Sequence, residues 1–142
     1  ELLVVVAIIG ILAAVGVVAY SGYTAGAKKS SSKSNHASVV KYVAAELKKC
    51  EIGSEKVMGG NLTCKDRKKA AGNVHKATND ALKDEFKNPY DTGSTAITTT
   101  TLTGCDSDTE GQTSVEDDKA TVTIKTCSAD GEKLLEGTVT IE

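Results

Sequence analysis

The stretch LLVVVAIIGILAAVGVVA, residues Leu2–Ala19, contains eighteen consecutive residues without a polar side chain. Only Gly10 and Gly16 interrupt its large apolar side chains and Ala residues, and Glu1 stands directly before it. About 20 residues of helix, at ~1.5 Å per residue, cross the ~30 Å hydrocarbon core of a bilayer. A core helix of a soluble protein would carry a polar stripe, which this stretch lacks. The stretch therefore predicts a helix of membrane-spanning length.

An apolar run of this kind is also typical of a cleaved signal peptide. Such a peptide begins with basic residues and ends at a small-residue cleavage site, followed by an independent domain. Here the run follows an acid and continues toward Lys28, Lys29 and Lys33 without a cleavage-like break. We therefore expect the run to remain part of the working protein.

The residues ELLVVVAIIGILAAV, Glu1–Val15, closely resemble the N-terminal segment of type IV pilins and type II secretion pseudopilins. The resemblance covers about the first twenty residues, and the rest of the chain matches only in general layout. In this family four further residues, usually beginning with an N-methylated phenylalanine, precede the acid, and a prepilin peptidase removes a short basic leader. The resemblance implies that Glu1 neutralises the terminal amine of a neighbouring subunit during assembly. A carboxylate buried beside an apolar helix needs such a cationic partner, because burying it alone costs several kcal/mol. Alternatively, Glu1 stays solvated at the interface, where the N-terminus of a helix favours an acid.

The same family commonly has a proline where this chain has Val18, and with it a kinked or melted helix segment. The helix-weakening residues available here are Gly10 and Gly16, each worth ~1 kcal/mol against helix relative to Ala. We therefore assign both glycines to assembly, and expect any melted stretch in an assembled filament to centre on Gly10–Val18.

The apolar run continues into an amphipathic pattern. Within Ala37–Leu47 the apolar residues recur at spacings of three and four, which is typical of one buried helix face. No proline intervenes, so the sequence predicts one helix from about Leu2 to about Lys49, or ~70 Å at ~1.5 Å per residue. We divide the chain into a filament-core or transmembrane helix, residues 1–23, and a globular head, residues 24–142, that includes the second half of the helix.

The remaining elements complete an α+β fold. A short helix is expected over Asn73–Phe86, where apolar residues share one helical face, and it precedes a turn around Pro89. Alternating β-branched residues predict strands within Ala96–Thr103, Lys119–Thr126 and Leu134–Ile141, the last two joined by a hairpin at Ala129–Glu132. We expect a small antiparallel sheet of three or four strands, packed on the second half of the long helix.

Charge is segregated along the chain although the net charge is only -2. Residues 24–79 carry twelve basic and four acidic side chains, whereas residues 80–142 carry five basic and fourteen acidic ones. This polarity suits head-to-tail packing in which the basic part of one subunit meets the acidic part of another. Two independently solvated surfaces would give the same pattern.

Four cysteines offer a way to stabilise a head with one Phe and no Trp. None stands in a CxxC motif, which argues against zinc or thioredoxin-like chemistry. Of the three possible pairings we favour Cys50 with Cys64 and Cys105 with Cys127, each contributing ~2–4 kcal/mol. Disulfides place the head outside the cytosol.

Chemistry-bearing motifs are few. No Ser or Cys motif accompanies His36 or His75, so we expect no enzymatic activity and no cofactor apart from a calcium ion. The calcium hypothesis rests on one loop that resembles the start of a calcium-binding loop, with departures at its fifth and twelfth positions. A plain acidic surface loop is the alternative. The four proposed ligands are Asp106, Asp108, Glu110 and Asp117.

Four surface segments carry weaker signals. KDRKK, residues 65–69, could contact a nucleic-acid backbone without reading its sequence, although a solvated loop produces the same composition. Asn61–Thr63 forms an N-glycosylation triplet, a pattern that often arises by chance. Ser30–Ser34 and the Thr-rich strand are candidates for O-linked sugar.

Three functional classes remain. The first is the major pilin of a type IV pilus, made in the bacterial inner membrane and then polymerised into a surface filament for adhesion, motility or DNA uptake. The second is a pseudopilin of a type II secretion system, and the third is a membrane-anchored periplasmic domain that does not polymerise. Two disulfides and a Ser/Thr-rich exterior favour the first, whose main partner is further copies of the same chain.

Overall fold

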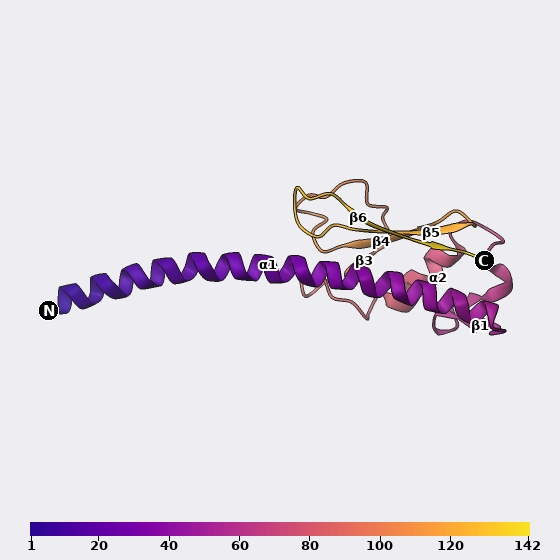
Figure 1. The fold of residues 1–142 in the computed structure, drawn as a ribbon, viewed down its shortest axis with the longest axis horizontal. Helices are drawn as coiled ribbons and strands as arrows, with labels where there is room; N and C mark the ends of the chain where they lie inside the picture. Colours follow the sequence, from indigo (N-terminus) through magenta and orange to yellow (C-terminus); the bar gives the residue numbers. More distant parts are fainter.

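A single helix, α1, spans Leu2–Glu51 and dominates the computed structural model, which describes residues 1–142 (Figure 1). The prediction of one continuous helix to about Lys49 is confirmed, and at ~1.5 Å per residue its length is about 75 Å. Basic Lys48 and Lys49 lie in its last turn, where they interact favourably with the negative end of the helix dipole.

The two halves of α1 have different surroundings. Its N-terminal half projects away from the rest of the molecule, whereas its C-terminal half lies along one side of the head (Figure 1). Every buried residue of α1 is in the second half: Ser32, Val39, Val43, Glu46 and Leu47. The amphipathic pattern of the second half therefore produces the packing that the sequence predicts.

A four-stranded sheet covers this half of α1 in the order β3-β4-β5-β6. Strand β5 pairs antiparallel with both β4 and β6, while β3 runs parallel to β4. The strands are β3 (Ile97–Thr98), β4 (Thr113–Asp117), β5 (Thr121–Thr126) and β6 (Leu135–Thr140). The expected α+β class is confirmed, but this sheet is mixed rather than purely antiparallel.

The strand predictions succeed for β5 and β6 and fail at the other edge. The Thr-rich segment Ala96–Thr103 forms only the two-residue β3, because just Ile97 and Thr98 pair with β4. Strand β4 was not predicted, since its residues TSVED end in two acids that resemble a loop. Its ladder with β5, from Thr113 opposite Thr126 to Asp117 opposite Val122, places β4 inside the sheet.

The core forms where alternate residues of the sheet face α1. In β5 the burial alternates strictly, with Val122, Ile124 and Thr126 inside. These side chains belong to or adjoin a cluster of fifteen buried residues that also includes Val39 and Val43 of α1. At ~25 cal/mol per Å² of apolar surface, burial of this cluster is the main force that holds the sheet against α1.

Helix α2 and a second sheet of two strands complete the head. Helix α2 spans Asn73–Leu82 and is shorter than the expected helix, which extended to Phe86. The carbonyl of Phe86 instead accepts a hydrogen bond from the N–H of Ala96, 2.8 Å away. Strands β1 (Lys56–Val57) and β2 (Leu62–Thr63) form an antiparallel pair, with short 3-10 turns η1 (Met58–Gly60) and η2 (Cys64–Asp66) beside them.

Both predicted disulfides are confirmed. Cys50 at the end of α1 is bonded to Cys64, and Cys105 is bonded to Cys127, which leaves no free thiol. The first bridge attaches the segment after α1 to the end of that helix. The second joins the acidic loop to the residue that follows β5.

Candidate assembly interface

The exposed apolar residues of α1, Leu2–Ala19, form one continuous surface that we call the assembly helix. None of it is buried within the subunit, and its large side chains are 52% (Val5) to 84% (Leu3) exposed. Soluble monomers rarely expose contiguous apolar patches above a few hundred Å². The helix is long and apolar enough to cross a membrane, and water alone is a poor surrounding for it.

Glu1 stands at the N-terminus of this helix with its side chain unused. Its backbone carbonyl accepts the first helical hydrogen bond, from the N–H of Val5 at 3.2 Å, but its carboxylate makes no capping bond. None of the six ion pairs of the subunit includes Glu1. The carboxylate is therefore available to a cation from outside the subunit.

Gly10 and Gly16 serve no packing purpose within the subunit. A Cβ placed on either glycine would meet no atom within 4 Å apart from the local helix backbone and chain neighbours. The helix passes through both positions without a break. Their role in assembly, and a melted stretch over Gly10–Val18 in a filament, stay predictions about contacts between subunits.

The head begins to cover α1 about nine residues after the assembly helix. Lys28 Nζ lies 5.5 Å from the centre of the Tyr90 ring, and Lys29 Nζ lies 2.8 Å from Glu132 Oε1. Tyr20 and Tyr23, between the assembly helix and these lysines, are 70% and 76% exposed. The loop that follows β5 is thereby held at the level of Lys29.

The opposite end of the head is attached to the last turns of α1. Lys48 Nζ lies 2.8 Å from Glu51 and 3.1 Å from Glu142. Arg67 Nε donates a hydrogen bond of 2.7 Å to the carbonyl of Glu142, and the Cys50–Cys64 bridge lies at the same end. The second half of α1 is therefore fastened at both of its ends, and the projecting half is continuous with a rigid support.

A polar row links α1 to the sheet between these two ends. His36 Nδ1 lies 2.9 Å from Thr126 Oγ1, which lies 2.7 Å from Thr113 Oγ1. Burial lowers the pKa of His36, because a partly desolvated imidazole resists protonation. Beside it, a Cβ on Gly137 of β6 would lie 2.6 Å from Val40 Cγ2, so only glycine allows α1 and β6 to approach this closely.

The structure does not bring the four proposed calcium ligands together. Asp106 Oδ1 accepts hydrogen bonds from the N–H groups of Asp108 and Thr109, and Glu110 Oε1 accepts one from the N–H of Asp130. No group of three or more His, Cys, Asp or Glu side chains is arranged to hold a metal ion. Asp106 thus completes a turn of its own segment, whereas Glu110 connects this segment to the loop that follows β5.

Asp117, the proposed twelfth-position ligand, has other partners in the structure. Asp117 lies in β4, and its two carboxylate oxygens accept hydrogen bonds from the N–H groups of Gly72 at 2.9 Å and His75 at 2.8 Å. A carboxylate at this place accepts hydrogen bonds from N–H groups that have no partner within the helix. Its negative charge also interacts favourably with the positive end of the α2 dipole. The capping interaction joins residues far apart in sequence, so no local motif could have revealed it.

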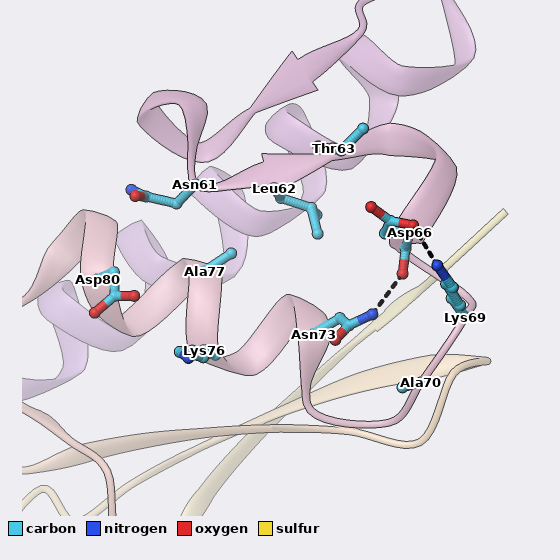
Figure 2. A pocket seen from close by; sticks show the side chains of 10 residues that line it. All are labelled: Asn61, Leu62, Thr63, Asp66, Lys69, Ala70, Asn73, Lys76, Ala77 and Asp80. Atoms are coloured by element: carbon cyan, nitrogen blue, oxygen red, sulfur yellow. Dashed lines mark hydrogen bonds and ion pairs between the residues drawn. The ribbon is translucent and has the colours of Figure 1, made fainter.

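A polar groove of about 520 Å³ lies between β2 and α2 and contains the glycosylation triplet (Figure 2). The Asn61 amide nitrogen donates a hydrogen bond of 2.8 Å to the carbonyl of Met58, and Leu62 is buried. Both signs of charge line the groove, through Asp66, Asp80, Lys69 and Lys76 (Figure 2). This balance gives the groove no preference for anionic or cationic ligands.

The basic segment Lys65–Lys69 is only partly free. Arg67 donates hydrogen bonds to the carbonyls of Cys64 and Glu142, and Lys69 lies 3.5 Å from Asp66. Lys65 and Lys68 are exposed and belong to no ion pair of the subunit.

Two of the six ion pairs, Lys29–Glu132 and Lys48–Glu142, join the basic and acidic parts of the chain within one subunit.

Comparisons of the chain with protein-family models, with curated proteins and with solved structures found no match. The functional argument therefore rests on the geometry above. That geometry consists of an exposed assembly helix, an unpaired Glu1 at its N-terminus and a head stabilised by two disulfides.

Proposed function

We propose that this chain is the structural subunit of a type IV pilus, a filament that forms when the assembly helices of many copies pack together. In this proposal the chain is first held in the bacterial inner membrane by the same helix and then joins a cell-surface filament. The filament would serve adhesion, motility or DNA uptake, and the chain itself would catalyse no reaction.

The observation that carries the proposal is the continuity of α1. Its first half exposes an apolar surface that needs cover, and its second half is the framework on which the head folds. A membrane anchor alone needs no rigid connection to a head, since a flexible linker would suffice. A single helix shared by anchor and head suits a polymer, because it transmits the orientation of each packed helix to its head.

In this proposal Glu1 fixes the orientation in which each copy joins the filament. A carboxylate buried among packed apolar helices is costly unless a cation neutralises it, and the subunit itself supplies none. The terminal amine of a neighbouring copy would supply that charge and would admit copies in one orientation only. A pseudopilin could use the same contact, so the extracellular length of the filament separates these two functions.

Shearing intact cells that produce the full chain tests the proposal. Filaments made of this chain should appear in the sheared fraction and in electron micrographs. Glu1→Ala should abolish or strongly reduce them while the amount of membrane-bound chain and the fold of the head stay unchanged. Glu1→Asp, which keeps the charge on a shorter side chain, should retain more filaments than Glu1→Ala.

Other outcomes identify the alternatives. Short fibres confined to the periplasm would favour the pseudopilin. Chain that stays monomeric in the membrane under all conditions would favour an anchored periplasmic domain. Normal filaments from the Glu1→Ala chain would contradict the proposed role of Glu1.

A further inference from the structure

The two ends of the head carry opposite charges on exposed loops. At the end nearest the assembly helix, the loops 104–111 and 127–134 contain five acidic residues and one basic residue. At the far end, the segment 64–69 contains four basic residues and one acidic residue. We call these loops the acidic end and the basic end of the head.

Contacts with α1 place both ends along the helix axis. The Lys29–Glu132 ion pair holds the acidic end at the level of Lys29, and the hydrogen bond from Gly131 N–H to the carbonyl of Cys105 joins its two loops. The Cys50–Cys64 bridge holds the basic end at the level of Cys50. Lys29 and Cys50 are 21 residues apart on α1, which corresponds to about 32 Å along the axis.

Several exposed charged side chains at the two ends form no ion pair within the subunit. Asp106, Asp108 and Asp130 at the acidic end are exposed and belong to none of the six ion pairs, and the same is true of Lys65 and Lys68 at the basic end. Among the lysines of α1 near the acidic end, Lys29 pairs with Glu132 and Lys28 lies over Tyr90. Lys33 is exposed and belongs to none of the ion pairs, although its charge acts on Glu132.

We propose that the acidic end of one head docks on the basic end of the head of a second copy of this chain. The inference rests on the proposed function, because packed assembly helices hold the copies parallel and bring opposite ends of successive heads toward each other. It goes further by naming the residues that meet: Asp106, Asp108 and Asp130 of one copy against Lys65 and Lys68 of the next.

The contact has a geometric consequence. Parallel copies that meet end to end must be displaced along the filament by about the length of the head, which is about 32 Å. Exposed charge pairs of this kind steer orientation and are screened by salt, while the apolar helices supply most of the association energy. The contact therefore sets the axial register of copies that the assembly helices hold together.

Charge reversal on the full chain tests the contact in sheared filaments. Lys65→Glu with Lys68→Glu, and separately Asp106→Lys with Asp108→Lys, should each reduce the yield of filaments at least threefold at low salt. The combination of all four substitutions should restore most of the yield. Asp84→Lys with Glu85→Lys, which reverses two exposed acids outside both ends, serves as the matched control and should leave the yield unchanged.

Zero-length carbodiimide crosslinking supplies an independent readout. In wild-type filaments it should join Lys65 or Lys68 to Asp106, Asp108 or Asp130, and such a link must come from two copies because the ends lie about 32 Å apart along α1. Wild-type filaments that lack these crosslinks and tolerate both reversals would overturn the contact alone. Absence of any wild-type filament would overturn the proposed function, and the contact with it.

Discussion

The carboxylate of Glu46, on the buried side of α1, accepts a hydrogen bond from the backbone N–H of Met58 and also pairs with Lys49. Met58 has a positive φ of 55°, unusual for a residue with a side chain, and its side chain is fully buried. Glu46 therefore holds the turn after α1 in a conformation that Met58 would not adopt readily by itself.

Replacing Glu46 should destabilise the head, because it leaves the buried N–H of Met58 without a partner. We expect Glu46→Ala to lower the free energy of unfolding by about 2–3 kcal/mol. Glu46→Gln, which keeps an acceptor for Met58 but loses the charge that pairs with Lys49, should cost less. Urea unfolding of the two variants measures both values, and equal losses would show that the hydrogen bond to Met58 contributes nothing.

Removing residues 1–27 should leave a soluble, folded and monomeric head. The fifteen residues of the core cluster all lie between Val39 and Ile141, so none belongs to the projecting half of α1. Sedimentation and circular dichroism of the fragment Lys28–Glu142 check this expectation, with the detergent-solubilised full chain as the reference. An aggregated fragment without its helical signal would mean that the assembly helix also stabilises the head.

Gly137 is the one glycine in the strands, and we expect it not to tolerate a larger side chain. The Cβ of Gly137→Ala would lie 2.6 Å from Val40 Cγ2 and 3.2 Å from His36 Nε2, which forces α1 and β6 apart. We expect a loss of about 1–3 kcal/mol in the free energy of unfolding.

Gly104→Ala is the matched control for this substitution, because a Cβ there meets no atom within 4 Å. Its effect should stay within about 0.5 kcal/mol. Comparable losses at both positions would argue that the cost at Gly137 reflects backbone flexibility rather than the contact with α1.

The head should lose stability as the pH falls below about 6.5, the ordinary pKa of histidine. Burial lowers the pKa of His36, so the unfolded chain takes up a proton at a higher pH than the folded head does. Stability is therefore complete above the unfolded pKa and declines as the pH drops toward the lowered folded pKa.

His36→Gln isolates this contribution, since the glutamine side chain is polar and cannot titrate. The variant should lose the decline between about pH 7 and 5, measured as the free energy of unfolding of the fragment Lys28–Glu142. The carboxylate Glu46 titrates in a lower range. Burial alone would raise the pKa of Glu46, but hydrogen bonds from Lys49 and the Met58 N–H lower it on balance. An unchanged pH profile in His36→Gln would assign the decline to other groups.

Local pattern was sufficient to predict α1, two of the strands and the disulfide pairing. The eighteen apolar residues and the spacing within Ala37–Leu47 predicted α1 almost to its end, because helical hydrogen bonds join residues four apart. The alternation in β5 and β6 predicted both strands, and the four cysteines were paired correctly.

The tertiary structure alone decided several other features that join distant segments. Strand β4 exists because β5 provides a partner for TSVED, and the same pairing carries Asp117 to the N-terminus of α2 instead of into a calcium loop. The bond between Glu46 and Met58 and the close approach of Gly137 to α1 likewise depend on how the head folds back on its helix. Periodicity records which side of an element is apolar, whereas the identity of the partner depends on the packing of the whole chain.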